Sequence, residues 1–522
     1  MTISTLRALP PLPLAILSLG AGALNVFTFA PFGWWPLQIL TLALLFHLVA
    51  GATKIRSAVT IAWLFGFGWS VCGVHWLYIS MHDYGGMPSA MAALAVALLA
   101  LYLGAFPAAV AGIATWLRQS RRVPASSILL LVLPALWILA EWLRGWLFTG
   151  FPWVSTGYAH TDSPLAGFAP VLGVYGVGWL AAVCSGCFAM ALQRRTASRK
   201  RIVPLLTLAA IALAGLGLRQ IDWTVPNGAP ISIRLLQGNV PQEMKFDPEQ
   251  ANQTLTLYED MIRTAPADLI ATPETALPLL ANQLPDDYLP RLSAFSSATN
   301  SHLAIGVPVS DGPRQYANSV LGISPGTANE ASAIYRYDKH HLVPFGEFIP
   351  LGFRWFVDMM HIPLGDFTRG AALQLPFDVR DQWVLPNICY EDLFGEEIAA
   401  QLRNSAAVGR PVATMLLNMS NIAWFGDSIA LPQHLQISQM RAIETGRPML
   451  RATNTGATAV VDPKGRIRAQ LKPFTRDVLT TSVQGYQGLT PYVRFGNAAI
   501  VLLASALLLA ARFLARKSSG HG

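Results

Sequence analysis

The sequence predicts two kinds of structure in one chain: a multi-span α-helical membrane domain and an α/β sandwich. The 522 residues are 53% apolar and only 13% charged, with a mean hydropathy of +0.41, whereas ordinary soluble domains are about 25% charged. The charges are also spread unevenly. They are sparse before Arg219, frequent between Ile221 and Gln487, and absent again from Phe495 until Arg512. We therefore expect a membrane domain, a globular domain and one closing helix.

About eight apolar runs approach the roughly 20 residues that a helix needs to cross the hydrocarbon of a bilayer. They lie near Leu12–Ala30, Trp34–Ala50, Ala58–Ile79, Ser89–Leu117, Ser127–Phe148, Pro164–Leu192, Ile202–Leu218 and Ala498–Leu514. The expected organisation is a transmembrane domain of about seven spans over residues 1–220 and a globular domain over 221–490. The final span and its tail then occupy residues 491–522.

Basic residues fall in every second loop between these runs and at both ends of the chain. They are Arg7, Lys54, Arg56, Arg118, Arg121, Arg122, Arg194, Arg195, Arg199, Lys200, Arg201, Arg512, Arg516 and Lys517. By the positive-inside rule, both termini face the cytoplasm and the globular domain lies on the opposite side of the membrane. The net charge of +8 is then explained by topology, and we expect no nucleic-acid partner.

The spans contain two features that could carry chemistry. Glu141 and Arg144 lie three positions apart on one face of a predicted helix, where either a function or their mutual pairing explains them. Cys184 and Cys187 have the spacing of a redox or metal pair. Because they lie in an apolar helix without a nearby histidine, packing is the favoured interpretation. Cys389 is the one cysteine of the globular domain, so its thiol has no partner there for a disulfide.

Strands and helices alternate in the globular domain, and this alternation predicts the α/β sandwich. Strands are expected at Ile231–Gln237, Asp268–Ala271, Leu303–Val307, Ser319–Ile323 and Gln382–Leu385, and helices at Pro248–Ala265 and Tyr288–Asn300. Pro386 and Asn387 are expected to interrupt the last of these strands, which would place Cys389 at its exit.

Three chemically distinct side chains follow predicted strands or lie in a loop that is expected to have a defined conformation. Glu274 comes directly after a buried strand, Lys339 lies among Pro, Phe and Gly in Tyr337–Glu347, and Cys389 follows the last predicted strand. A surface lysine and a buried structural cysteine are the alternatives. Together the three supply a base for the thiol proton, a cation for a developing oxyanion and a nucleophile, which is what acyl transfer needs.

These motifs resemble those of a known superfamily. Pro273-Glu274, Lys339 with Leu342–Glu347, and Cys389-Tyr390-Glu391 are similar to the Glu-Lys-Cys motifs of the nitrilase (carbon–nitrogen hydrolase) superfamily. Joined to about eight spans, the chain resembles the bacterial apolipoprotein N-acyltransferases, which add the third acyl chain to lipoproteins. The similarity extends through Gln237–Asn239, Trp424–Gly426, Gln433-His434, Arg441-Ala442 and Arg451–Asn454.

The resemblance implies a nitrilase-type αββα sandwich and a role for each motif residue. Glu274 would be the general base, Lys339 the oxyanion stabiliser and Cys389 the nucleophile, assisted by the backbone amide after the cysteine. No metal and no cofactor are implied. The residues expected to bind substrate or support the site are Glu347, Tyr390, Glu391, Phe246, Asn318 and, from the membrane domain, Arg144.

The resemblance also implies the substrates and the location. A phospholipid, typically phosphatidylethanolamine, would donate an acyl chain to Cys389 as a thioester. The α-amine of a diacylglyceryl-cysteine at the N-terminus of an apolipoprotein would then attack it, in a ping-pong pattern. The expected location is the bacterial inner membrane, with the catalytic domain on the periplasmic side.

The chain departs from the family pattern at three positions. The family often has tryptophan where Thr272 and Phe246 stand, and usually aspartate where Ile422 stands. These changes alter the wall near the lipid site without touching the catalytic residues. They bear on substrate preference and efficiency, and are typical of a diverged second copy in a cell that keeps a more typical enzyme.

Two other classes of function remain open at this point. A membrane-anchored hydrolase would use the same three residues with water as the acceptor. A transporter or receptor would use the globular domain only to bind ligand, with Glu141 and Arg144 lining a path. Pro344–Asp366 and Asn421–Leu431, which are rich in Pro, Gly and aromatic residues, are expected either to cover the site as lids or to dip into the membrane interface.

Overall fold

The computed structural model describes residues 11–191, 198–245, 248–313, 315–326, 334–350, 352, 354 and 366–519. The chain forms two compact units. The helical unit comprises Met1–Tyr78, Ser89–Ile221 and Phe495–Gly522, and the sheet unit comprises Ile79–Pro88 and Asp222–Arg494. The sheet unit is therefore built from two separate stretches of sequence.

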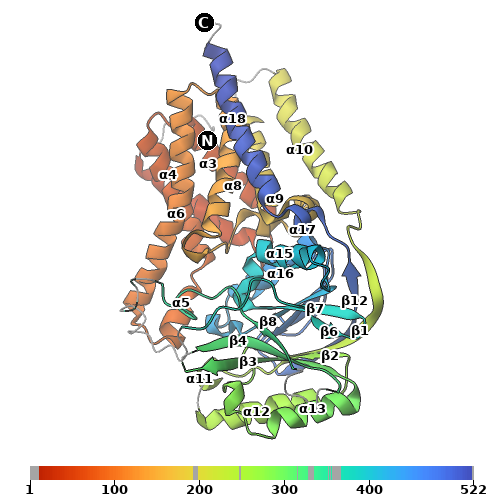
Figure 1. Ribbon diagram of the computed structural model, residues 1–522. Helices are drawn as coiled ribbons and strands as arrows, with labels where there is room; N and C mark the ends of the chain where they lie inside the picture. The colour runs from red at the N-terminus through yellow and green to blue at the C-terminus, as the bar shows by residue number, and fades with distance from the viewer. Residues whose placement is uncertain are drawn as a thin grey trace. The chain divides into compact units, whose positions relative to one another are not determined.

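Long helices make up the helical unit, and several of them run alongside one another (Figure 1). They are α2 (Pro11–Ala23), α3 (Trp35–Gly51), α4 (Ile55–Gly73), α6 (Ser89–Ser120), α8 (Leu133–Arg144), α9 (Ala169–Ala191), α10 (Ser198–Leu218) and α18 (Ala498–Ser519). Within the described residues, five segments have the length and composition to cross a membrane. They are Pro11–Thr28, Ile55–Gly73, Ser89–Ser120, Ala125–Arg144 and Pro164–Ala191. Trp35–Gly51, Ile202–Leu218 and Ala498–Phe513 are shorter apolar helices.

Small residues let α2 and α4 approach closely. A Cβ atom added to Gly22 would lie 1.9 Å from the carbonyl oxygen of Phe65, and one added to Gly68 would lie 2.3 Å from that of Leu19. Ser18 also donates a hydrogen bond across the pair, to the carbonyl of Ile61 at 2.6 Å. Small side chains at a helix contact are typical of packing inside membranes, where close backbone approach replaces the hydrophobic driving force.

Two six-stranded sheets form the centre of the sheet unit. The first has the order β12-β1-β2-β3-β4-β5 and the second β11-β10-β9-β8-β7-β6. The strands are β1 (Val225–Gln237), β2 (Leu269–Ala271), β3 (His302–Gly312), β4 (Gln315–Ile323), β5 (Tyr335–Asp338), β6 (Phe377–Val379), β7 (Gln382–Ile388), β8 (Met415–Ser420), β9 (Met449–Thr453), β10 (Ala459–Val461), β11 (Ile467–Gln470) and β12 (Asp477–Gln487). In each sheet three neighbouring strands are parallel, β1-β2-β3 and β7-β8-β9.

Helices cover the outer faces of the two sheets. In Figure 1, α12 (Pro248–Arg263) and α13 (Tyr288–Thr299) lie against one side of the pair, and α15 (Gly395–Ala407) and α16 (Ala430–Thr445) against the other. A core of apolar side chains from both sheets, including Ile233, Leu417 and Leu450, is almost wholly buried. This is the αββα sandwich that the resemblance implied.

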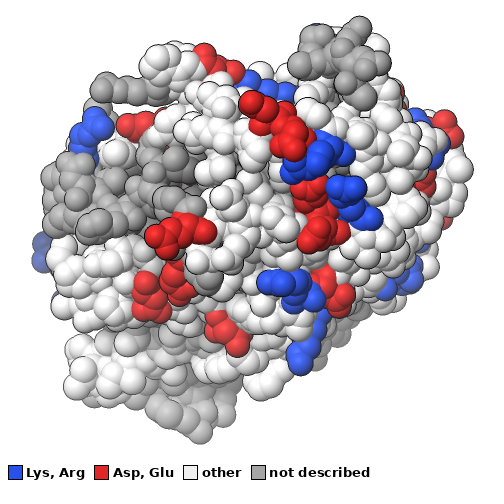
Figure 2. Space-filling model, turned by 90° about the horizontal axis from the view of Figure 1, so that it is seen from below, with Lys and Arg blue, Asp and Glu red and all other residues white. Residues whose placement is uncertain are grey.

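The outer face of α12 and α13 carries charges of both signs. Arg291 forms an ion pair with Glu259 at 2.9 Å, and Arg263 reaches the same carboxylate at 3.1 Å. Figure 2, which views the molecule from below, shows acidic and basic side chains close to one another on the face in view. Pairs with exposed arginines of this kind add little stability, and here they keep an outer helical face polar.

One predicted strand boundary is wrong. Strand β7 is not interrupted at Pro386 and Asn387 but continues through both residues to Ile388. The physical reason is that β6 pairs only with Gln382–Val384, so one side of β7 has no partner strand at the proline, where a missing N–H is tolerated. Cys389 nevertheless follows the last residue of the strand, as expected.

The segment Ile79–Pro88, between α4 and α6, belongs to the sheet unit by its contacts. The ring of Tyr84 packs edge-on against Trp424, with ring centroids 6.1 Å apart. Trp424 lies in a 3-10 helix, Ile422–Phe425, that follows β8. A short segment of the sheet unit therefore lies far ahead of the rest of that unit in the sequence, which begins at Asp222.

Candidate active site

The three side chains singled out in the sequence converge at one edge of the two sheets. Glu274 follows β2, Lys339 follows β5 and Cys389 follows β7, and β2 and β7 each belong to the parallel part of their sheet. Lys339 Nζ lies 3.2 Å from Glu274 Oε1. The thiol of Cys389 interacts electrostatically with both groups. The carboxyl ends of parallel strands are a frequent position for functional groups in α/β folds.

Lys339 is held between two carboxylates. Its side chain is only 1% exposed, and Nζ donates to Glu347 Oε1 at 2.8 Å as well as to Glu274. Burial by itself lowers the pKa of Lys339, but Glu274, Glu347 and Cys389 outweigh that effect and raise it above its usual range. The lysine is therefore a buried cation in a fixed position.

Asn318, on β4, joins the two carboxylates. Its Nδ2 donates to Glu274 Oε1 at 2.8 Å and to Glu347 Oε1 at 3.0 Å. Backbone amides fix the other carboxylate oxygens. Asn421 N–H donates to Glu274 Oε2 and Val343 N–H to Glu347 Oε2, both at 2.8 Å. Each carboxylate is thus oriented through both of its oxygens.

Cys389 has an unusual backbone conformation for a residue with a side chain. Its φ is 51°, in the left-handed region that costs energy for any residue except glycine and is often found at functional sites. Burial raises the pKa of the thiol to about 12, Glu274 adds to this effect, and Lys339 opposes it. The thiol is therefore neutral near pH 7, and a base must remove its proton before sulfur can act as a nucleophile.

Glu391 connects the loop after Lys339 to the strand before Cys389. It accepts hydrogen bonds from the backbone N–H groups of Ile388 at 2.6 Å, His340 at 2.7 Å and His341 at 3.2 Å. The hydroxyl of Tyr337 donates to the same carboxylate. Burial raises the pKa of Glu391 to about 7, while the backbone donors work in the opposite direction. The Glu391 side chain therefore holds the loop after Lys339 next to the end of the strand before Cys389.

Tyr390, which precedes Glu391, packs against two neighbouring rings. It is buried, and its ring lies 5.2 Å from that of Phe394 and 5.8 Å from that of His341. Thr272 and Ile422, at two of the positions that depart from the family pattern, are fully or almost fully buried. Phe246, the third such position and an expected substrate-binding residue, lies outside the described residues.

Arg144 is described in the helical unit, on α8. Its Nη2 donates to Ser155 Oγ at 2.8 Å, while Glu141 accepts from the backbone N–H and the hydroxyl of Thr156 at 2.9 and 2.6 Å. A small cavity of ≈ 30 Å³ beside the two side chains is bordered by Trp69 among others. Both ionisable groups therefore anchor the Ser155-Thr156 segment.

Several residues that organise the site received no role from the sequence, although His434 belongs to a segment that resembles the family. Asn421 holds Glu274, Asn418 Nδ2 donates to the carbonyl of Cys389 at 3.2 Å, and His434 contacts the same carbonyl. Asn418 gives a signal in the sequence, because it is a polar residue inside the largely apolar strand β8, Met415–Ser420. Asn421 gives none, because it holds Glu274 through its backbone N–H. The role of His434 depends on contacts far apart in the sequence.

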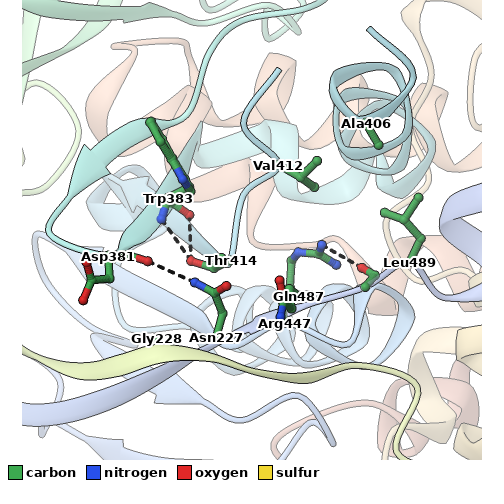
Figure 3. Close-up of a pocket in the computed structure, with 11 residues that line it drawn as sticks. Asn227, Gly228, Asp381, Trp383, Ala406, Val412, Thr414, Arg447, Gln487 and Leu489 are labelled. Atoms are coloured by element: carbon green, nitrogen blue, oxygen red, sulfur yellow. Dashed lines mark hydrogen bonds between the residues drawn. The ribbon is translucent and has the colours of Figure 1, made fainter. Parts of the chain in front are cut away.

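A separate cavity of ≈ 580 Å³ lies at the other ends of the parallel strands (Figure 3). The residues that line it include Trp383, the second residue of β7, and Thr414 and Arg447, which precede β8 and β9. Arg447 is fully buried, and it donates to the carbonyls of Ala413, Thr445 and Gly488. This cavity is therefore separate from the site formed by Glu274, Lys339 and Cys389, because Glu274 and Cys389 follow the opposite ends of their strands.

A carboxylate, a buried ammonium group and a thiol meet at the edge of an αββα sandwich, which is the arrangement that the resemblance to the carbon–nitrogen hydrolase superfamily implies. Residues 233–492 match the model of the carbon-nitrogen hydrolase family, and residues 21–187 match that of the apolipoprotein N-acyltransferase N-terminal domain. Among solved structures, an amidase from Nesterenkonia sp. is similar over 53% of this chain and 97% of that chain, with 19% identity and a TM-score of 0.38.

Whole-chain relatives give a closer match. An apolipoprotein N-acyltransferase from Ralstonia nicotianae is 51% identical over 511 residues, covering 97% of this chain and 94% of that protein. One from Nitrosomonas europaea is 46% identical over 499 residues, covering 95% of this chain and 96% of that protein. The chain belongs to the apolipoprotein N-acyltransferase family, and it is a membrane-bound acyltransferase.

Proposed function

We propose that this chain transfers an acyl chain from a glycerophospholipid, through a thioester on Cys389, to the N-terminal α-amine of S-diacylglyceryl-cysteine lipoproteins. The observation that carries the proposal is the convergence of Glu274, Lys339 and Cys389 in a member of this family. Phosphatidylethanolamine is the proposed donor. The reaction would complete the maturation of a lipoprotein.

The first half of the proposed reaction forms the thioester. Glu274 takes the thiol proton as Sγ of Cys389 attacks the ester carbonyl carbon of the phospholipid. The carbonyl oxygen becomes an oxyanion, which Lys339 and the N–H of Tyr390 stabilise. When the tetrahedral intermediate collapses, the carbon–oxygen bond to the glycerol breaks. The leaving alkoxide takes the proton from Glu274 and departs as a lysophospholipid.

The second half resolves the thioester on the lipoprotein. The neutral α-amine attacks the thioester carbonyl, and Glu274 takes one of its protons. The same donors stabilise the second oxyanion. The carbon–sulfur bond then breaks, Cys389 regains a proton from Glu274, and an amide is left on the lipoprotein. Dividing the transfer into two steps lets one site serve two bulky lipids in turn.

The surroundings of Lys339 suit this sequence of steps. The lysine is charged before substrate arrives, and Glu347 restrains it through a 2.8 Å contact. A pre-oriented cation stabilises a developing oxyanion without reorganising during the reaction. Glu391 and Tyr390 have supporting roles, while Phe246 is proposed to line the lipid site.

The proposed setting is the bacterial inner membrane, with both termini in the cytoplasm and the catalytic domain on the periplasmic side. The proposed boundaries remain 1–220, 221–490 and 491–522. Attachment to the bilayer would keep the site at the surface where both lipid substrates reside, which raises their effective concentration. Arg144 is proposed to support the helical bundle near a donor headgroup.

The decisive experiment is intact-mass spectrometry of the purified protein. It would be incubated with phosphatidylethanolamine, and then with a diacylated lipopeptide that carries a free α-amine. We expect an acyl adduct on Cys389 that disappears as the lipopeptide becomes triacylated. The controls are Cys389→Ala and Cys389→Ser, which should fold in the membrane and show neither adduct nor product.

Other outcomes would identify a different function. An adduct that decays into free fatty acid, with the lipopeptide unchanged, would indicate a hydrolase. Turnover retained in either cysteine variant would overturn the nucleophile assignment. Absence of any adduct in the wild-type protein, together with specific ligand binding, would indicate a binding protein.

A further inference from the structure

The backbone carbonyl of Cys389 is held by two side chains from neighbouring elements. His434 Nε2, on α16, lies 3.2 Å from this oxygen, and Asn418 Nδ2, on β8, donates to it at 3.2 Å. Asn418 Nδ2 also donates to Asn387 Oδ1 at 2.7 Å. His434 is 1% exposed and Asn418 is fully buried. The carbonyl of the nucleophilic residue is therefore fixed from two directions inside the protein.

Arg451 determines the tautomer of His434. Its Nη2 lies 3.0 Å from His434 Nδ1, and a guanidinium can only donate hydrogen bonds. Nδ1 must therefore be the acceptor, which leaves the ring proton on Nε2, facing the carbonyl of Cys389. Burial and the nearby Arg451 charge both lower the pKa of His434 well below its usual range. The imidazole thus stays neutral, with one defined donor.

Asp392 fixes Arg451 in turn and closes a ring of contacts. Arg451 Nη1 lies 3.1 Å from Asp392 Oδ2, and both residues hydrogen-bond to Ser438 Oγ. Asp392 lies three positions after Cys389, in the same 3-10 helix, Cys389–Leu393. The residue that anchors the arginine is therefore part of the turn that His434 restrains, and all of these side chains are buried.

The restrained carbonyl belongs to the peptide that joins Cys389 to Tyr390. This peptide is trans, so its C=O and N–H point to opposite sides of the chain. Holding the carbonyl against His434 and Asn418 turns the N–H of Tyr390 away from α16. The left-handed φ of 51° at Cys389 sets the direction of the turn. The orientation of this N–H is therefore fixed before any substrate arrives.

We propose that His434 is a positioning residue that aims the N–H of Tyr390 at the oxyanion, through its hydrogen bond to the carbonyl of Cys389. Arg451 and Asp392 serve this role by fixing the ring and its tautomer. The inference rests on the proposed acyl transfer through Cys389. It predicts that loss of His434 impairs formation of an oxyanion more than it impairs the sulfur nucleophile itself.

Two reactions of the same sulfur separate these effects. Acylation by phosphatidylethanolamine passes through an oxyanion, whereas alkylation by iodoacetamide displaces iodide from a saturated carbon and forms none. For His434→Ala we expect the acylation rate, followed by intact mass, to fall by about 10- to 100-fold. The rate of alkylation at Cys389 should change by less than about threefold. His434→Gln, whose amide N–H can reach the same carbonyl, should recover part of the acylation rate.

Asn418→Ala is the second variant, because it removes the other donor to the carbonyl and should show the same separation. His302→Ala is the matched control. It removes another buried imidazole of the sheet unit, one that contacts the carbonyl of Asp268, and both rates should remain near those of the wild type. If the two rates fell in parallel in His434→Ala and Asn418→Ala, these residues would only hold the fold, and the inference would be wrong. Unchanged acylation would also overturn it. No adduct in the wild-type protein would instead refute the proposed function.

Discussion

Lys339 Nζ lies 3.2 Å from Oε1 of Glu274, so the candidate base and the candidate oxyanion stabiliser form an ion pair in the resting site. Each partner also has its own support, because Glu347 holds the lysine and Asn318 holds both carboxylates. The geometry therefore does not rest on one contact. Removing the charge of Lys339 and removing the neutral amide of Asn318 should therefore have different effects on the rate and on stability.

Replacing Lys339 with methionine should affect both catalysis and stability. The oxyanion would lose its cation, so the rate of acyl labelling should fall by at least about 100-fold. Glu274 and Glu347 would be left without the cation between them, so the free energy of unfolding should fall by about 3 kcal/mol. The rate can be followed by intact mass and the stability by thermal unfolding in detergent. Lys339→Met combined with Glu347→Gln should recover stability but not rate. Recovery of the rate in this double variant would show that Lys339 is not the stabiliser of the oxyanion.

Asn318 offers a nearly isosteric test. Asn318→Asp would replace the amide that donates to Glu274 and Glu347 with a third negative charge. We expect acyl labelling to fall by about tenfold or more, and further than in Asn318→Ala, because like charges at this distance repel. The measurement is the labelling rate of the two variants side by side at pH 7. Equal rates would indicate that the amide only fills space.

The pH dependence of thiol modification follows from the raised pKa of Cys389. Because burial raises this pKa to about 12, the thiolate fraction should increase about tenfold for each pH unit below that value. Alkylation of Cys389 by iodoacetamide should therefore keep rising from pH 7 to pH 10 without a plateau. Cys389→Ala corrects for the remaining cysteines. A rate that reaches half of its maximum near pH 9 and levels off by pH 10 would indicate a thiol with an ordinary pKa and contradict the expectation.

Arg144 can be tested against its own hydrogen-bond partner. Arg144→Gln removes the charge and alters the bond to Ser155, whereas Ser155→Ala removes only the hydroxyl. If the charge acts on a donor headgroup, the phosphatidylethanolamine concentration for half-maximal labelling should rise several-fold in Arg144→Gln and change little in Ser155→Ala. Unchanged donor dependence in Arg144→Gln would remove this role and leave a structural one.

The parts of the fold that could be predicted are those with a strong local pattern. The sequence predicts helices α12 and α13, and it predicts the inner residues of β1, β3 and β4 as short, largely apolar runs. The structure confirms all five elements. Strands β6, β10 and β11 are only three or four residues long, and they are not among the strands that the sequence predicts. Their existence depends on pairing with strands distant in the sequence, which local composition does not reveal.

In the site, too, some features could be predicted from local sequence and others depend on contacts between distant segments. Residue type pointed to Glu274, Lys339 and Cys389, because a carboxylate, an amine and a thiol near strand ends are chemically distinctive. Many of the contacts that orient them come instead from backbone N–H groups, such as that of Asn421 on Glu274 and that of His340 on Glu391. Every residue except proline carries this donor. The sequence therefore cannot indicate which backbone N–H groups donate to the site, and only the fold shows which of them lie near its carboxylates.

The placement of Ile79–Pro88 limits how far this protein can be dissected. A fragment that begins at Asp222 would contain every strand that the structure describes and the three candidate catalytic residues. It would still lack Tyr84, which packs on Trp424, three positions after the residue whose backbone holds Glu274. The two halves are therefore not interchangeable modules. A graft of this sheet unit onto another anchor would need to bring the Ile79–Pro88 segment with it.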